Sequence, residues 1–292
     1  MPEALIPTVR LIPLSAARAR WILAAALIAG GWSGVAPAAD DVAELVARGG
    51  CPGCDLRLAT LRSIQIEGAD FTGTVLREAD LKYATLPDAR FAKADLRRTE
   101  MENTTLPRGD FTRANMRGVD LEKSDLGGAI LVSADLREAD LADTVLDGAD
   151  LRDADLRSAL LRRGSAKGAV FRDAKLEVAD LERMTLDGAD FTGARLSGAD
   201  LDRVKAPGAI FRGADLRSVR LASADLTGAD LTGADLEDAY LRRTNLSGAD
   251  LSGVKKLDQG RLDLACGDAA TRLPEGLTIK PCGAENAPDR DG

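Results

Sequence analysis

Residues 224–236 read ADLTGADLTGADL, in which Ala, Asp and Leu are followed each time by two turn-forming residues. The pattern extends in both directions: from Leu56 to Leu251 every fifth residue is Leu, Phe, Met or Ile, except Ala166 and Ala206. A period of five matches neither the 3.6-residue period of a helix nor the alternation of a strand. It predicts short sides, in which the small and the large residue point inward and Asp points outward, joined by turns.

A second period of 20 residues indicates how many sides make one coil. All six Phe residues are separated by 20 residues or by multiples of 20, and Leu131 and Leu151 fill the positions between them. Four five-residue sides per coil explain both periods. Because one coil buries its apolar side chains only by stacking on the next, the two ends of such a stack need caps. The six Phe are Phe71, Phe91, Phe111, Phe171, Phe191 and Phe211.

In these residues the chain resembles the pentapeptide-repeat family, whose motif is A-(D/N)-L-x-x. The resemblance runs through residues 55–254 without a break. It implies the fold of that family, an all-β solenoid: a right-handed quadrilateral β-helix, here of about ten coils with short helical caps. The motif indicates a fold and names no partner. Residues 164–168 are the side with no large inward residue, and we expect the coil to be weakest there.

The first 38 residues have the pattern of an export signal. Arg10, Arg18 and Arg20 precede an apolar run at residues 21–35, and small residues at 36–38 fit cleavage before Ala39. The run has about 15 residues, fewer than the roughly 20 that span a bilayer. We therefore expect a periplasmic or secreted protein with no membrane span after cleavage. Retention of the signal as an anchor is the alternative.

The segments that flank the repeats are expected to form caps. In residues 39–54 a short helix starts at Asp40 or Asp41 and ends at a Gly pair, residues 49–50. Residues 255–282 predict a second cap, with a short helix at 258–264, and residues 283–292 are expected to be disordered. The apolar face of the first helix, which should cover the first coil, consists of Val42, Leu45 and Val46.

Four Cys residues lie outside the repeats, two at each end. Because a disulfide requires Cα atoms within about 7 Å, bridges along a rod of ten coils are impossible within one chain. We therefore expect Cys51–Cys54 and Cys266–Cys282 bonds, formed in an oxidising compartment. A redox role for the C-x-x-C pair would require a strand-to-helix context, so a structural link is favoured. The same end-to-end distance excludes a four-cysteine zinc site.

Composition leaves little room for catalysis. The 292 residues include no His, which excludes catalysis and metal ligation by histidine. The many Asp residues occupy one repeated outward position, which is typical of a solvated face rather than of a catalytic pair. No nucleophile elbow, P-loop or dinucleotide-binding motif occurs. We therefore expect no enzymatic activity, no cofactor and no metal.

One column of basic residues stands out, and we call it the arginine strip. Its members recur every 20 residues, so they should stack in six successive coils. The strip is a candidate surface for an anionic partner, either an acidic protein or an envelope component. The alternative is a ladder neutralised by neighbouring carboxylates for stability alone. The strip consists of Arg57, Arg77, Arg97, Arg117, Arg137 and Arg157.

Binding is the function class that the sequence favours, as a protein-interaction or scaffold rod, and a homodimer is possible. The resemblance also implies an alternative, because family members that bind DNA gyrase present an acidic rod that mimics DNA. Residues 55–256 hold 31 Lys and Arg against 36 Asp and Glu, a mixed surface unlike a phosphate backbone. Export is a second argument against gyrase, and we expect no direct contact with nucleic acid.

Overall fold

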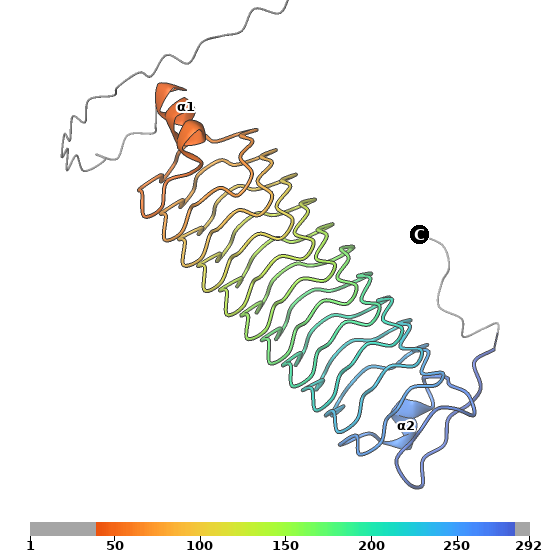
Figure 1. Cartoon of the computed structure of the whole chain (residues 1–292). Coiled ribbons are helices and arrows are strands. Elements are labelled where there is room, and N and C mark those ends of the chain that lie inside the picture. Colours follow the sequence, from red (N-terminus) through yellow and green to blue (C-terminus); the bar gives the residue numbers. More distant parts are fainter. Residues whose placement is uncertain (1–38, 284–292) are drawn as a thin grey trace, which may run out of the picture. The chain divides into compact units, whose positions relative to one another are not determined.

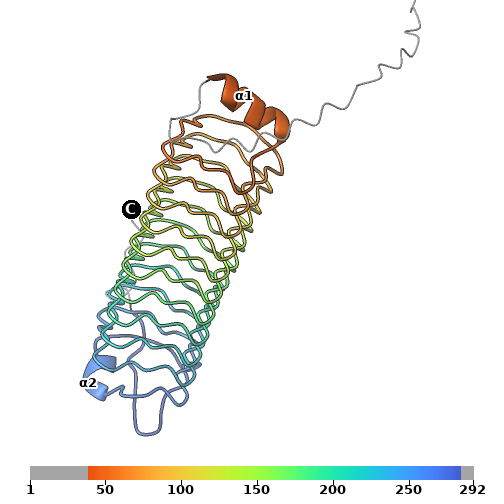
Figure 2. The same cartoon turned by 90° about the vertical axis from the view of Figure 1, so that its left-hand side faces the viewer.

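The computed structural model describes residues 39–283, which form a stack of four-sided coils (Figures 1 and 2). Every bridge residue pairs in parallel with the residue 20 positions later, from Gly50 with Asp70 to Asp235 with Lys255. Helices α1 (Ala39–Arg48) and α2 (Gln259–Leu262) lie at opposite ends of the stack. Because each side has only five residues and two belong to a turn, the coils pair through single bridges rather than long strands.

Nearly every side closes with a hydrogen-bonded turn, and the third residue of each turn has positive φ. In the side that begins at Leu56, the N–H of Ala59 donates to the carbonyl of Leu56 at 3.1 Å, and Leu58 has a φ of 59°. Positive φ recurs at every fifth residue from 58 to 253, as type II turns require. The Leu58 N–H donates to the carbonyl of Arg77 in the next coil at 3.1 Å. The central peptides of the turns therefore form their own ladder along the stack.

The inward positions make one continuous core. The large residues and the Ala residues two positions before them are almost completely buried. Phe71, Phe91 and Phe111 stack with ring centroids 5.1 and 5.0 Å apart, and a second stack formed by Phe171, Phe191 and Phe211 has distances of 4.6 and 5.0 Å. The expected column of Phe is confirmed. Such stacked pairs contribute about 0.5–1.5 kcal/mol each beyond burial of area.

Hydroxyl groups occupy some of the small inward positions without remaining unpaired. The buried hydroxyls of Thr74, Thr99, Thr144 and Thr244 each donate to the carbonyl of the residue 23 positions earlier, at 2.7–2.9 Å. A buried hydroxyl without a partner would cost about 1–3 kcal/mol. The regular offset between coils supplies the acceptor, so Thr replaces Ala without that penalty.

The N-terminal end begins one side earlier than residue 55, where the repeats were expected to start. Helix α1 ends in a Schellman motif, because the N–H groups of Gly49 and Gly50 donate to the carbonyls of Val46 and Leu45, both at 3.1 Å. Gly50 then pairs with Asp70, and a Cβ at residue 50 would lie only 2.3 Å from the Asp70 carbonyl oxygen. Only Gly allows the chain to pass from the helix into the first coil there.

Two details of α1 differ from expectation. The helix begins at Ala39, so Asp40 and Asp41 lie within its first turn rather than before it. Leu45 is buried against the coils and Val42 packs beside it, but the side chain of Val46 is 39% exposed. One residue rotates a helix by about 100°, so Val46 turns away from the face that Leu45 presents.

At the C-terminal end the repeat stops, and an irregular segment pairs with the backbone groups of the last coil. Helix α2 ends at Leu262, two residues before the expected 264, because the chain must extend to pair Cys266 with Asn245. The Leu246 N–H donates to the Cys266 carbonyl at 2.8 Å, and the Cys266 N–H donates to Thr244 at 3.0 Å. Arg272 continues the next side by pairing with Asp250. These bonds give the last coil hydrogen-bond partners that a repeat would otherwise supply.

The side without a large inward residue keeps the regular backbone pairing. Ser165 bridges both Val145 and Thr185, and the Ala166 N–H donates to Thr185 at 2.8 Å. Gly164 is closely packed, since a Cβ there would lie 2.8 Å from the Thr144 carbonyl oxygen. Whether this side opens first stays a prediction, which amide exchange through residues 160–170 can test.

Val178 occupies a turn position that a β-branched residue rarely adopts. Its φ is 60° and its side chain is 67% exposed, so it carries left-handed strain with little burial to offset it. We predict that Val178→Gly raises the free energy of unfolding by about 0.5–1 kcal/mol, because Gly adopts this φ without the Cβ clash. Chemical denaturation measures the change.

Val145→Gly is the matched control for that substitution. Val145 is also exposed, at 39%, but it is a bridge residue outside the left-handed region. Gly there should lower stability by about 0.5–1 kcal/mol, since it loosens the unfolded chain without relieving strain. Equal losses for both variants would show that turn strain at Val178 is negligible.

Candidate functional site

The arginine strip occupies the first turn position of one side in six successive coils. Its guanidinium groups are half exposed. In this side the bridge residue lies two positions before the arginine and also points outward. The identity of that bridge residue decides what each arginine contacts.

Four strip arginines are held by the bridge Asp of their own side. Arg97 donates to Asp95 through Nε at 2.8 Å and through Nη2 at 2.6 Å, and Arg137 makes the same forked contact with Asp135. Arg57 and Arg157 repeat it. The Arg97 hydrogen bond lowers the pKa of Asp95 to about 2. These arginines are neutralised locally, as the alternative of a ladder formed for stability alone requires.

The two remaining strip arginines reach into the next coil. Their own bridge positions are Val75 and Asn115, which offer no carboxylate. Arg77 therefore donates to Asp95 at 3.0 Å and shares it with Arg97, whereas Arg117 donates to Glu138 at 2.7 Å. The Nε–H of Arg77 is buried and has no hydrogen-bond partner in residues 39–283. The charge of the strip is least compensated at these coils.

A hollow of about 370 Å³ opens where this compensation fails. Gly118 provides no side chain there, and Arg98 has no carboxylate partner within the described part of the chain. Four arginines and two glutamates line the hollow, so its lining is net positive. The sequence analysis did not single out Arg98. The available signal was that the positions two residues before Arg77 and Arg117 are Val75 and Asn115 and not Asp, which marks the coils around Arg98 as irregular. The lining residues are Arg77, Glu78, Arg97, Arg98, Arg117, Gly118 and Glu138.

Another side carries acidic residues in four successive coils: Asp80, Glu100, Asp120 and Asp140 are bridge residues of one column. Burial raises the pKa of Asp120 to about 6, and the neighbouring Glu102 and Asp140 charges contribute. The N–H of Glu122 donates to Asp120 at 3.1 Å and opposes this shift only in part. Burial, together with the neighbouring carboxylates, therefore disfavours the charged form of Asp120 in the folded state.

Both expected disulfides are present. Cys51 and Cys54 are joined with Cα atoms 5.6 Å apart, and Cys266 and Cys282 with Cα atoms 4.8 Å apart. The first bond closes the first side of the stack, in which both Cys occupy inward positions. The C-x-x-C pair lies in a coil turn and not between a strand and a helix, because the Cys54 N–H donates to the Cys51 carbonyl at 3.3 Å.

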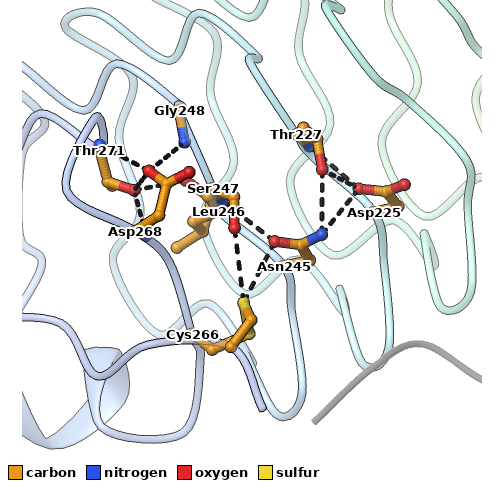
Figure 3. Close-up of a disulfide and its surroundings, with 10 residues drawn as sticks. Asp225, Thr227, Asn245, Leu246, Ser247, Gly248, Cys266, Asp268 and Thr271 are labelled. Carbon is orange, nitrogen blue, oxygen red and sulfur yellow. Dashed lines mark hydrogen bonds between the residues drawn. A yellow bond between two sulfur atoms is a disulfide. The ribbon is translucent and has the colours of Figure 1, made fainter. Parts of the chain in front are cut away.

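The second disulfide lies beside the last coil, where Cys266 is completely buried (Figure 3). Cys282 Sγ lies 3.3 Å from Asn245 Oδ1, and Asn245 Nδ2 donates to Thr227 at 2.9 Å. On the other side of the bond, the carboxylate of Asp268 accepts from the Gly248 N–H at 2.9 Å. Cys282 and Asp268 therefore both hold the irregular segment against the last coil, through Asn245 and Gly248.

The repeats match the family model described as pentapeptide repeats, in eight copies that extend from residue 54 to residue 255. The chain belongs to the pentapeptide-repeat family. Proteins of this family form right-handed β-helical solenoids and are generally non-enzymatic structural or protein-binding proteins. The matched segments are residues 54–91, 94–132, 124–163, 167–203, 194–233 and 220–255.

Solved structures of other pentapeptide-repeat proteins are similar to this one. HetL from the cyanobacterium Nostoc sp. strain PCC 7120, involved in heterocyst differentiation regulation, is 30% identical, with 80% of this chain and 98% of HetL covered and a TM-score of 0.39. QnrB1, a plasmid-mediated fluoroquinolone resistance protein, is 20% identical over 65% of this chain and 90% of its own, with a TM-score of 0.33.

A third similar structure is a pentapeptide-repeat protein from the thylakoid lumen of Arabidopsis thaliana. It is 27% identical, with 47% of this chain and 79% of that chain covered and a TM-score of 0.29. No curated protein matches the chain. Over residues 39–283, no helix of this pentapeptide-repeat protein is long and apolar enough to cross a membrane. The same residues contain no group of three Cys, Asp or Glu that could hold a metal ion.

We predict that Asp120→Asn stabilises this pentapeptide-repeat protein at pH 7.5 by up to about 1 kcal/mol after solvent screening. The folded-state pKa of about 6 exceeds the ordinary 3.8, so the folded state binds the proton more tightly. The loss of stability caused by the Asp120 charge is complete above pH 6 and decreases as the pH falls toward 4. Urea denaturation at pH 7.5 and 4.5 measures both limits, and Asn keeps the acceptor for the Glu122 N–H.

Asp95→Asn is the control of opposite sign. Because the pKa of Asp95 is lowered to about 2, its charge stabilises the folded state above pH 4, and this stability is lost as the pH falls through 2. The substitution should therefore destabilise the protein by about 1 kcal/mol at pH 7.5. An Asp120 variant that behaves like the Asp95 variant would contradict the unfavourable burial of the Asp120 charge.

Proposed function

We propose that this pentapeptide-repeat protein is exported and acts in the periplasm, or outside the cell, as a non-enzymatic rod that binds a protein partner. The inward positions of the coils are filled by buried apolar side chains, so the outer sides are the surfaces available to a partner. The observation that carries the proposal is the basic hollow at Arg77, Arg98 and Arg117, where the regular neutralisation of arginine by Asp stops.

The disulfides support the proposed compartment. A bond closes each end of the stack, and disulfides persist in oxidising compartments such as the bacterial periplasm. The signal pattern of residues 1–38 lies outside the described residues and is the second argument for export. The cysteines and the signal pattern belong to separate parts of the chain.

Intact-mass measurement of protein from fractionated cells tests export directly. We predict a periplasmic product that begins at Ala39 and gains 4 Da on reduction, about 1 Da for each of four thiols. Full-length protein with four free thiols in the cytoplasm would contradict both the signal and the oxidising compartment. A full-length, oxidised, membrane-associated product would instead identify the signal as an uncleaved anchor.

The charge of the hollow indicates an acidic partner surface. Arg57, Arg97, Arg137 and Arg157 are occupied by their own Asp residues, so a partner gains little from them. Arg98 has no carboxylate partner among residues 39–283, and Arg117 is held only by a Glu whose side chain is 58% exposed. A carboxylate-rich protein loop or an anionic envelope component can replace that contact.

We predict that Arg98→Glu with Arg117→Glu reduces capture of partner proteins from a periplasmic extract at least tenfold, because it reverses the charge of the hollow. The matched control is Arg90→Glu with Arg113→Glu on another side. Arg90 reaches across one coil to Asp70, as Arg117 does to Glu138, and Arg113 has no ion pair within the described coils. Equal capture by the two variants would reject the basic hollow at Arg77, Arg98 and Arg117 as a binding surface.

The acidic column at Asp80, Glu100, Asp120 and Asp140 favours a second candidate, a DNA-mimicking inhibitor or protector of a topoisomerase such as gyrase. One carboxylate per coil is one charge per about 4.8 Å. Duplex DNA carries one charge per about 1.7 Å, so the mimicry would be sparse. Inhibition of gyrase supercoiling at micromolar protein would favour this candidate over the first.

A further inference from the structure

A second hollow, of about 160 Å³, opens on the side whose bridge residues include Asp200, Arg220 and Tyr240. In this side the two turn positions are charged at residues 202–203 and again two coils later at residues 242–243. In the coil between them the same two positions are Ala222 and Ser223. The gap left by these two small side chains is the hollow. It is lined by Asp202, Arg203, Ala222, Ser223, Arg242 and Arg243.

The hollow is electropositive because its only carboxylate is already engaged. Asp202 is buried, with 8% exposure, and it accepts from the Ala222 N–H at 2.8 Å while pairing with Arg220. Arg203 contacts Glu182 through Nη1 at 2.6 Å, which leaves its other N–H groups available. Three guanidinium groups therefore surround the hollow with no free carboxylate among its lining residues.

Arg242 and Arg243 differ from most arginines of the coils. Same-side or cross-coil carboxylates hold nearly all the others, whereas these two adjacent and exposed residues have no ion pair within residues 39–283. The Ser223 hydroxyl likewise makes no hydrogen bond there. Arg98, Arg113 and Arg162 also lack an ion pair, but none of them lines this hollow. Unused donors thus converge on one small space.

From this convergence we propose that the hollow around Ser223 binds a phosphate group. Guanidinium presents its N–H donors in a fork that matches phosphate oxygens, and the Ser hydroxyl adds a further donor. The volume is below the roughly 300 Å³ of pockets for drug-sized ligands, which suits one small anion or a single headgroup. Free phosphate and the phosphomonoester of a lipid share this chemistry. The site lies on a different side from the arginine strip and stands without it.

Isothermal titration of the purified protein with inorganic phosphate, against chloride at equal ionic strength, tests the site. We expect Arg242→Gln with Arg243→Gln to weaken phosphate binding at least tenfold. Arg113→Gln with Arg162→Gln removes the same charge from arginines outside the hollow and should change affinity less than twofold. Equal losses in the two double variants, or no binding by the unmodified protein, would overturn the proposal.

Ser223→Leu separates a shaped site from a group of surface charges. The substitution fills the hollow and keeps all three arginines, and Leu58 shows that a Leu is accommodated at this turn position with the same φ of 59°. We expect at least a tenfold loss of phosphate affinity. Retained binding would show that the arginines act without the hollow, which contradicts the proposal.

Vesicle sedimentation distinguishes the two sources of phosphate. Vesicles of phosphatidylcholine with 20 mol% phosphatidic acid are compared with phosphatidylcholine alone, using the same variants. Sedimentation with phosphatidic acid that is lost in the Arg242 and Arg243 variant supports a lipid headgroup. Binding of inorganic phosphate in the titration, without sedimentation of the protein with phosphatidic acid vesicles, supports a free anion as the ligand. Binding abolished by Arg98→Glu with Arg117→Glu but not by the Arg242 and Arg243 variant would overturn the site.

Discussion

The ladder of turn peptides along the stack is the interaction on which the coils depend. From Gly53 to Gly233 the third turn residue of each side donates its N–H to the carbonyl of the second turn residue one coil later, as Leu58 does to Arg77. The bridge residues form a second ladder, for example through the Leu56 N–H and the Val75 carbonyl at 2.7 Å. Both ladders require the same φ at every turn, so a side cannot relax alone. This constraint explains why many residues other than Gly, including Val178, adopt positive φ.

The five-residue period was sufficient to predict which side chains point inward, because inward and outward positions are set by the turn geometry alone. The 20-residue period likewise placed the Phe stacks and the members of the arginine strip on common columns. The ends were harder to predict. Residues 255–283 leave the period, so the pairing of Cys266 with Asn245 depends on contacts with the last coils that no repeat specifies. At the other end, the first side begins at Gly50 because a disulfide supplies the inward pair.

The contacts of the strip could not be predicted from the column itself. Whether a strip arginine closes on its own side depends on the bridge residue two positions earlier: Asp95 holds Arg97, but Val75 and Asn115 send Arg77 and Arg117 into the next coil. The contacts of Arg77 and Arg117 with the next coil join residues that are 18 and 21 positions apart, and they depend on how far each side chain extends. The chemistry of the surface is therefore a property of pairs of coils, whereas the fold is a property of single sides.

Local pairing, rather than net charge, decides what this surface can attract. Where an Asp precedes an Arg by two residues, the forked ion pair cancels the field within a few ångströms, well inside the roughly 8 Å screening length of physiological salt. Such coils offer a partner little beyond a solvated pair. Where Val75, Asn115, Ala222 or Ser223 interrupts the pattern, an arginine loses its partner or a side chain is missing, and both hollows occur at such interruptions. A repeat protein with an acidic chain can therefore present confined basic sites, because departures from the repeat leave both space and unpaired charge on the same side of adjacent coils.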